Sequence, residues 1–595
     1  MKLQHRQDVP VEHTWDPSII YKDDQSMKDA LNQVEKQAES LKGWTAKGKT
    51  LEQIMADIKV FESLYVTLRK IGTYSSLYSS ADMTDVKNQE RTSLFSNALQ
   101  KIGPILSGMS TSFSKLEDES LMALAEKNPP YKRFFEEIKR EKKHLLSDET
   151  EHALSMLSQA LGLPYTIYEK AKLADMSFSS FKASGKEFDQ SFVLFENHYQ
   201  YEPDKEIRRE AFKNFSKKIR EYHNTIGTAL ITQVQKEKQM SLLRGHASVQ
   251  EYLLFEQEIS LDIYNTHLDT FMEKLAPVMR KYAGLIAEVH SIEDLHFADL
   301  KLPIDTQYSP TITIEESKAM ARDALSIMGE EYLSHVDTML NERAIDWAQN
   351  IGKSTGGFCT SPYDVPHGFI LMSFTNLLSE VFTLVHELGH AVHFMMANKE
   401  QTSMGTNPSQ YFIEAPSTIN ELLLTNFLTK KSDDPTYKRY VITSLLGNTY
   451  YHNCVTHFLE AYFQREVYRL VDQGAPLTPS KLDQLKKETL ETFWGDAVII
   501  DDDAALTWMR QPHYYMGLYP YTYSAGLALA TKMAVMINED PKAAEDWIEV
   551  LKAGGTKSPV ELAQVAGVDI HKNHHLVETI DYIESLVDEA LALSQ

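Results

Sequence analysis

The sequence predicts a mostly α-helical fold. Apolar residues recur at intervals of three and four over long stretches, for example Leu51, Ile54 and Ile58, and this spacing places them on one face of a helix. Glycine and proline are modest, at 25 and 21 of 595 residues, and no Ser- or Pro-rich stretch marks a flexible linker. Because 43% of the residues are hydrophobic, the chain can bury a large core, and we expect a continuous helical framework.

The first part of the chain, residues 26–172, is predicted to form successive amphipathic helices whose apolar faces cover one another. The best defined of them spans residues 50–77. A mixed charged run at 132–143 is typical of a solvated helix face. It ends near Ser147, whose hydroxyl can cap the next helix.

The pattern changes between Met176 and Tyr201, where aromatic and polar residues alternate around a Ser-Gly-Lys turn at 184–186. This alternation predicts a small β-hairpin. A new helix is expected to begin at the sequence Glu-Pro-Asp, residues 202–204. We therefore divide the chain at about residue 200, into an N-terminal helical region, 1–200, and a second region, 201–595.

In the second region, long helices are predicted to about residue 295, followed by a proline-containing loop and a helix beginning near Ile314. Residues 352–373 differ, because Gly-Gly-Phe-Cys-Thr-Ser at 356–361 and Gly-Phe-Ile-Leu-Met-Ser at 368–373 are typical of two short strands. We expect them to form a small sheet directly before the next helix.

That helix is predicted over residues 377–397, which are apolar at helical spacing and contain one glycine and no proline. Within it, His386 and His390 are four residues apart and share a face, and Glu387 lies beside them. The pattern H-E-x-x-H is the signature of zinc metallopeptidases. We expect both imidazoles to bind one zinc ion; the alternative is that they only form hydrogen bonds in the core.

A catalytic zinc ion normally has three protein ligands and one open position. Candidates for the third are His393, Glu400, Glu414 and Glu421. His393 cannot easily reach the same ion without breaking the helix, and Glu400 follows a lysine in what we expect to be an exposed turn. Glu414 is preferred because Pro416 marks the first turn of a new helix and puts Glu414 at its entry. Glu421 remains the alternative ligand, or a partner for the other nitrogen of a ligating imidazole.

These motifs together resemble the thimet-oligopeptidase-like family of zinc metallopeptidases. The resemblance rests on HELGH at 386–390, a Gly-Thr turn at 405–406, FIEAPS at 412–417 and Glu421, and continues through WMRQPHYY at 508–515 and LKAGGTKSP at 551–559. It implies a multi-helix, two-lobed body enclosing a deep substrate channel. It also implies one zinc ion per chain and endopeptidase action on short peptides, which makes 201–595 the catalytic region.

Hydrolysis of an amide needs a nucleophile, a base and a donor that stabilises the oxyanion. The expected nucleophile is a zinc-bound water, with Glu387 as the general base. A neutral donor should face the oxyanion opposite the metal. The resemblance assigns substrate and oxyanion contacts to His513 and to the pair Tyr521 and Tyr523.

An exposed edge of the sheet at 352–373 can bind an extended peptide by backbone pairing. The alternative is a hairpin that only supports the metal-binding helix.

Two other functions are alternatives to an endopeptidase: a non-catalytic peptide-binding or scaffold protein, and a zinc exopeptidase. The presence of Glu387 and of all three ligand types argues against the scaffold.

Composition limits the partners and the location. The net charge of -24 argues against nucleic acid, whose phosphates require a basic surface. Cys359 and Cys454 are the only cysteines, which suits a reducing compartment. Residues 1–8 contain no apolar signal segment, and nowhere do 18 apolar residues run together. We expect a cytoplasmic enzyme acting on short peptides, without membrane or nucleic-acid partners.

Overall fold

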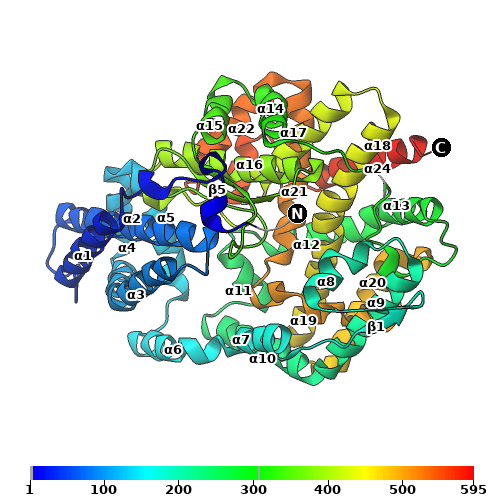
Figure 1. Cartoon of the computed structure of the whole chain (residues 1–595). Coiled ribbons are helices and arrows are strands. Elements are labelled where there is room, and N and C mark those ends of the chain that lie inside the picture. Colours follow the sequence, from blue (N-terminus) through cyan, green and yellow to red (C-terminus); the bar gives the residue numbers. More distant parts are fainter. Residues whose placement is uncertain (1–3, 306–307, 595) are drawn as a thin grey trace.

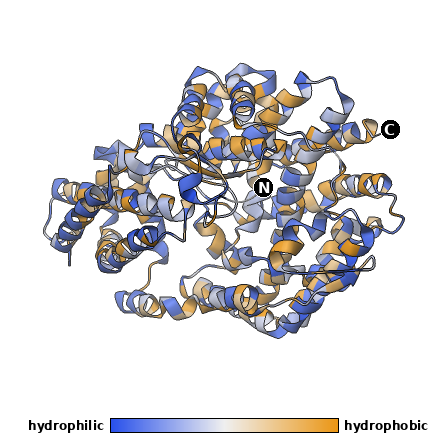
Figure 2. Ribbon diagram, in the orientation of Figure 1, coloured by the Kyte–Doolittle hydropathy of each residue, from blue (hydrophilic) through white to orange (hydrophobic). Residues whose placement is uncertain are grey.

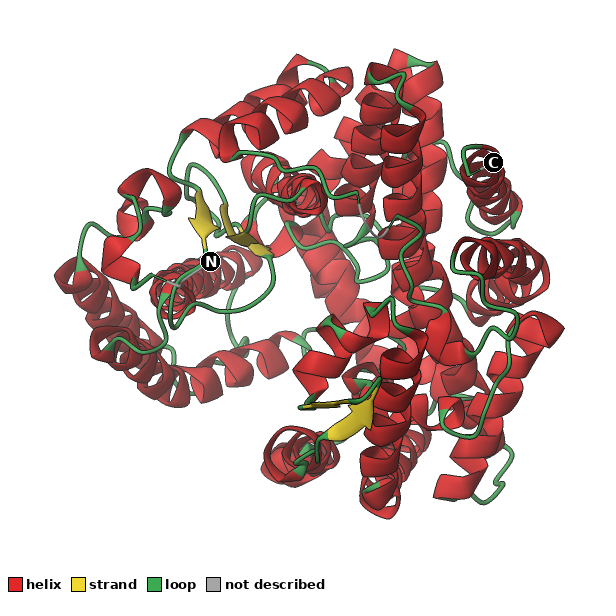
Figure 3. Cartoon of the chain, turned by 45° about the vertical axis from the view of Figure 1, so that its right-hand side comes forward, coloured by secondary structure: helices red, strands yellow, loops and turns green. Residues whose placement is uncertain are grey.

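Helices make up most of the computed structural model, which describes residues 4–305 and 308–594 (Figure 1). Within these residues there are two small sheets, one of two strands and one of three (Figure 3). The predicted mostly α-helical class, with a small sheet next to the helix that contains His386 and His390, is confirmed. Residues 1–3 belong to the segment on which the expected absence of a signal peptide depends, and they lie outside the described residues.

The N-terminal helices pack around two small hydrophobic clusters. The helix predicted over 50–77 is α2, which joins the clusters by burying Ile54 and Ile58 in one and Leu64 and Leu68 in the other. Figure 2 shows the mixture of hydrophobic and hydrophilic residues within single helices that this packing requires. Ser147 caps the next long helix as predicted, by accepting from Thr150 N–H. The helices are α1 (Asp24–Ser40), α2 (Leu51–Ala81), α3 (Val86–Phe113), α4 (Asp118–Lys127), α5 (Lys132–Glu141), α6 (Asp148–Leu161) and α7 (Leu163–Lys170).

The predicted hairpin is present as β1 (Phe181–Ala183) and β2 (Lys186–Phe188), which pair antiparallel. Ser184 and Gly185 form its turn, both with positive φ. The helices expected after 202–204 and near Ile314 begin at Lys205 and Ile314. This part contains α8 (Phe192–Asn197), α9 (Lys205–Glu221), α10 (His223–Leu243), α11 (Val249–Phe255), α12 (Leu261–Thr270), α13 (Ala276–Val289), α14 (Ile314–Leu325) and α15 (Glu330–Asn341).

The three-stranded sheet lies between one of the small clusters, the one that contains Leu64 and Leu68, and the large hydrophobic core. Its order is β3 (Ile345–Ala348), β5 (Phe369–Phe374), β4 (Phe358–Thr360). Phe369 and Leu371 of β5 pack on the N-terminal helices, whereas Ile370 and Met372 pack in the large core, as the alternation of side chains along a strand requires. The two predicted strands are therefore confirmed. The sequence did not indicate β3, which pairs parallel to β5.

The large core contains buried residues from Tyr168 to Ala590, and the division of the chain at about residue 200 stays a prediction. None of the helices in the described residues is both long and apolar enough to cross a membrane. The remaining helices are α16 (Leu378–Glu400), α17 (Ala415–Lys431), α18 (Pro435–Ser444), α19 (Phe458–Asp472), α20 (Pro479–Trp494), α21 (Pro520–Glu539), α22 (Pro541–Ala553), α23 (Pro559–Val565) and α24 (His574–Ala592).

Candidate metal centre

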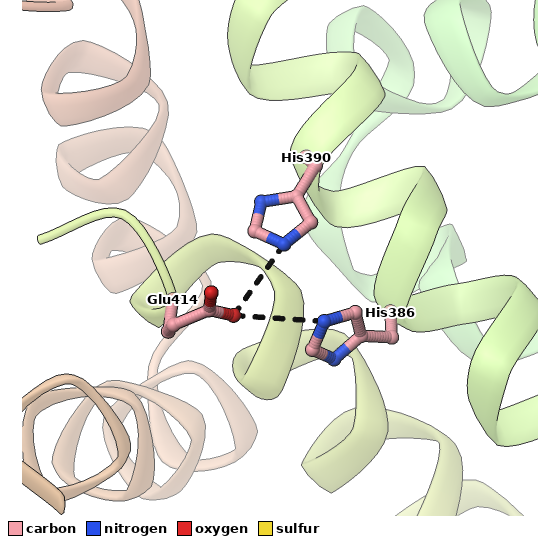
Figure 4. Close-up of side chains that lie close together, drawn as sticks. All are labelled: His386, His390 and Glu414. Atoms are coloured by element: carbon pink, nitrogen blue, oxygen red, sulfur yellow. Dashed lines mark ion pairs between the residues drawn. The ribbon is translucent and has the colours of Figure 1, made fainter. Parts of the chain in front are cut away.

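The structure brings His386, His390 and Glu414 together (Figure 4). Both histidines project from one face of α16, and Glu414 immediately precedes α17. Glu414 Oε2 lies 3.6 Å from His386 Nε2 and 3.4 Å from His390 Nε2. Three potential ligand atoms from two helices therefore converge on one point.

Gly389 explains how Glu414 comes so close to α16. A Cβ atom at Gly389 would lie 2.3 Å from the carbonyl oxygen of Pro416 and 2.6 Å from Cα of Ser417. Only a residue without a side chain allows the backbone at the start of α17 to approach this near. The glycine in HELGH thus sets the separation between the two histidines and the carboxylate.

Replacing Gly389 with alanine is expected to push α17 away from α16. Overpacking of this kind typically costs about 1–3 kcal/mol of unfolding free energy, and here it should also weaken metal binding. Urea unfolding and zinc titration measure the two effects. The matched control is Gly284→Ala in α13, where the added Cβ meets no atom within 4 Å. Equal metal affinity in both variants would contradict this role for Gly389.

The three residues fit a zinc ion. Ligand atoms at about 2.0–2.2 Å from a tetrahedral zinc ion are roughly 3.3–3.6 Å apart, which agrees with the separations of Glu414 from both imidazoles. Burial would raise the pKa of Glu414, but interactions with His390, His386 and Ser417 outweigh it and lower that pKa to about 2. The carboxylate is therefore ionised, as a ligand must be.

The other nitrogen of His386 is held by Glu421 from α17. His386 Nδ1–H donates to Glu421 Oε1 over 2.7 Å, and Thr449 donates to the second oxygen of the same carboxylate. This bond fixes the imidazole ring and directs Nε2 toward Glu414. Carboxylates behind metal-binding histidines commonly have this role.

Glu421→Gln is expected to reduce zinc affinity by about 10- to 100-fold, the usual effect of losing such a partner. The amide is neutral and binds the imidazole N–H more weakly than a carboxylate does. Competition with a fluorescent zinc chelator measures the change. An unaltered dissociation constant would show that the bond does not support the metal centre.

Glu387 lies beside the three converging groups. It is 7% exposed and lines a cavity of about 520 Å³ together with His386, Glu414 and Tyr523. Burial raises its pKa above the ordinary value. Its Oε1 also lies near Gly357, which directly precedes β4, so the start of this edge strand adjoins the carboxylate.

Of the three residues predicted to contact the substrate or the oxyanion, only Tyr523 lines this cavity of about 520 Å³, which we call the metal cavity. Tyr523 donates to Tyr519 Oη over 3.1 Å and stacks on His457. His513 lies on the far side of Tyr523, with Nδ1 3.4 Å from Glu460 Oε2. Tyr521 is 1% exposed and donates to Gln257 Oε1 within the core. That burial does not favour substrate contact by Tyr521.

Two of the weighed alternatives for the third ligand lie away from the converging atoms. His393 is 1% exposed and packs in the core behind the metal-binding face of α16. Glu400 is exposed at the last position of the same helix. The third alternative, Glu421, contacts His386 on its other nitrogen.

The profile of a family described as Peptidase family M3 matches residues 198–582, which is more than half of the chain. The chain belongs to peptidase family M3. A second profile, described as Oligopeptidase F, matches residues 113–178.

Known relatives of this M3 peptidase can be aligned with it over nearly its whole length. Oligopeptidase PepF of Bacillus subtilis is 27% identical, with 99% of this chain and 88% of the relative covered. The plasmid-encoded oligoendopeptidase F of Lactococcus lactis subsp. cremoris is 25% identical, with 98% of each chain covered. The chain is therefore an enzyme that hydrolyses peptides, a metalloendopeptidase of the oligopeptidase type.

Solved structures share the fold. Oligoendopeptidase-F from Enterococcus faecium superimposes with a TM-score of 0.73 at 24% identity, covering 96% of this chain and 98% of that one. A crystal structure from Chlamydophila abortus gives a TM-score of 0.89 at 20% identity, with both chains fully covered. Zinc dependence is general in peptidase family M3.

The structure of this M3 peptidase adds a side-chain cluster that the sequence did not indicate. Glu460 accepts from His457 Nδ1–H over 2.8 Å, and His457 Nε2 lies 3.0 Å from His452 Nε2. With His513 they form a connected polar chain that reaches the metal cavity at His452. The spacing of His452, His457 and Glu460 matches no metal or catalytic motif, so only the fold could place them together.

Proposed function

We propose that this M3 peptidase binds one zinc ion per chain through His386, His390 and Glu414, and cleaves internal bonds of short peptides with Glu387 as the general base. The observation that carries the proposal is the convergence of the three ligand atoms, two of which belong to residues that line the same cavity as the buried carboxylate of Glu387. We also propose that it acts in the cytoplasm, which the two unpaired cysteines favour.

Zinc at this centre would supply a Lewis acid that lowers the pKa of water to about 7 and polarises the substrate carbonyl. Glu387 accepts a proton from the attacking water and delivers it to the leaving amine. Burial raises its pKa, which makes the carboxylate a stronger base toward the water. Glu421 holds the His386 ring throughout, through the bond at Nδ1.

The oxyanion requires a neutral hydrogen-bond donor in the same cavity. Tyr523 is the best candidate because its phenol lies in the cavity and burial raises its pKa, so that it keeps its proton. His513, beyond Tyr523, is proposed to contact the substrate. Tyr521 is proposed to support this segment of α21 through Gln257.

The strand β4 is proposed as the substrate platform. Within the described residues it pairs with β5 alone, so its other edge has no strand partner. Its first residue follows Gly357, beside Glu387. An extended peptide paired with this edge would pass the general base.

Digestion of a peptide with an acetylated N-terminus and an amidated C-terminus tests the function. Zinc-loaded protein is expected to cut it at an internal bond, which mass spectrometry of the products identifies. A blocked peptide that stays intact while its unblocked form loses terminal residues would instead identify an exopeptidase. No cleavage of either peptide would contradict the proposed activity.

A further inference from the structure

A second cavity adjoins the metal cavity. Its volume is about 420 Å³, and both cavities are lined by His452 and Tyr523. Tyr201, Phe297 and Trp494 contribute aromatic surface to the second one. The two cavities are therefore neighbours across His452 and Tyr523.

Two lysines reach the second cavity without a carboxylate partner in the described residues. Lys301 Nζ contacts Thr456 Oγ1 at 3.4 Å and lies 4.6 Å from the Tyr451 ring centroid. Lys486, from α20, is 4% exposed, and its Nζ lies 5.7 Å from the Phe463 ring centroid. Neither lysine forms an ion pair with any residue that the structure describes.

Each carboxylate that lines this cavity has a close partner, although the second oxygen of Glu460 accepts no hydrogen bond from a described residue. Glu460 accepts from His457 Nδ1–H, and Glu196 pairs with Arg510 over 3.1 Å. Arg208, which also lines the cavity, pairs with Asp299. Neither lysine therefore has a counter-ion within ion-pair distance in the described residues. At longer range both lie in the field of the Glu460 carboxylate, which raises their pKa, and of Arg510, which lowers it.

Burial of a cation without an ion-pair partner is unfavourable. Desolvation lowers the pKa of Lys301 to about 8 and that of Lys486 to about 8; Arg510 adds to the effect and Glu460 opposes it. Both amines are still mainly protonated at neutral pH. An anionic group placed between them would compensate two buried charges at once.

We propose that the cavity containing Lys301 and Lys486 binds a carboxylate of the peptide substrate, either its C-terminus or an Asp or Glu side chain. This inference rests on the proposed function, because it assumes a peptide at the metal centre. The position of this cavity next to the metal centre, across His452 and Tyr523, favours a carboxylate carried by the peptide over a free anion. The aromatic walls suit the rest of the residue that bears it.

The site is built on rigid supports. Lys301 follows a short helical turn at Phe297–Asp299, in which Asp299 is held by ion pairs with Arg208 and Arg209. Lys486 projects from the buried side of α20. Two lysines held from separate elements fix the position of the carboxylate and so favour certain registers of the peptide across the metal centre.

Equilibrium binding to zinc-loaded Glu387→Gln protein tests the proposal without turnover. One peptide pair has neutral side chains and differs only in a C-terminal carboxylate or amide. A second series is blocked at both ends and carries a single Asp, or Asn as its control, at successive positions. Calorimetry is expected to give roughly tenfold tighter binding for the carboxylate in one series or both. Equal affinities in both series would overturn the proposal.

In the Glu387→Gln protein, Lys301→Met and Lys486→Met are each expected to lower the ratio of carboxylate-peptide affinity to neutral-peptide affinity toward one. The matched control is Lys487→Met, which removes the same charge from the next position of α20 but on its exposed side, where Lys487 pairs with Asp502. It should retain the preference. A preference that survives both cavity variants would assign the carboxylate to another place and overturn the proposal.

A turnover measurement distinguishes failure of the proposed function from failure of the proposed carboxylate site. Cleavage of the fully blocked neutral peptide by native zinc-loaded protein tests the proposed function and does not require a carboxylate. If that peptide stays intact, the proposed function fails, while the binding series still decides whether the cavity prefers a carboxylate.

Discussion

Glu387→Gln protein is expected to retain stoichiometric zinc and to lose kcat by about 10²- to 10⁴-fold, the usual contribution of a general base. The amide has nearly the shape of the carboxylate but cannot accept the proton of water. Because Glu387 does not belong to the three converging ligand groups, the metal centre should remain intact. This is one of the two largest effects that we expect.

Steady-state kinetics on the blocked peptide and elemental analysis of the same sample provide the measurement. Glu400→Gln is the matched control, since Glu400 lies exposed at the end of the same helix. It should have normal kcat and zinc content. A Glu387→Gln enzyme with near-normal kcat would mean that another group accepts the proton.

Glu414→Ala is expected to abolish both stoichiometric zinc binding and turnover. The two imidazoles of α16 remain, but the carboxylate that completes the site from the start of α17 is gone. The loss of affinity should exceed the roughly 100-fold upper end expected for an outer partner such as Glu421.

The order of zinc affinity in the two variants shows which carboxylate is the ligand. Zinc affinity should fall in the order native, Glu421→Gln, Glu414→Ala, as measured by competition with a chelator of known affinity. If Glu421→Gln removed zinc more completely than Glu414→Ala, the two carboxylates would have exchanged roles. Glu421 would then be the ligand, the alternative that spacing alone left open.

Local sequence patterns were sufficient for much of the framework. Periodicity placed α2 and α16, and turn residues placed the hairpin at Ser184 and Gly185. The entry of α17 followed from Pro416. These features depend on contacts within a few residues, which sequence spacing records.

Features that depend on packing between distant segments were not predictable in the same way. The need for glycine at position 389 arises from the backbone of Pro416 and Ser417. Tyr521 and Tyr523 are two residues apart on one helix, so they face different sides of α21, one toward Gln257 and the other toward the cavity. Lys301 and Lys486 lie far apart in the sequence, and only the fold places both in the lining of one cavity.

Zinc titration of metal-free protein, followed by cleavage of the blocked peptide, tests the central claim most directly. Activity is expected to be absent without zinc, to rise in proportion to added zinc, and to stop rising at one equivalent per chain. Internal cleavage by protein shown by elemental analysis to contain no metal would contradict the account.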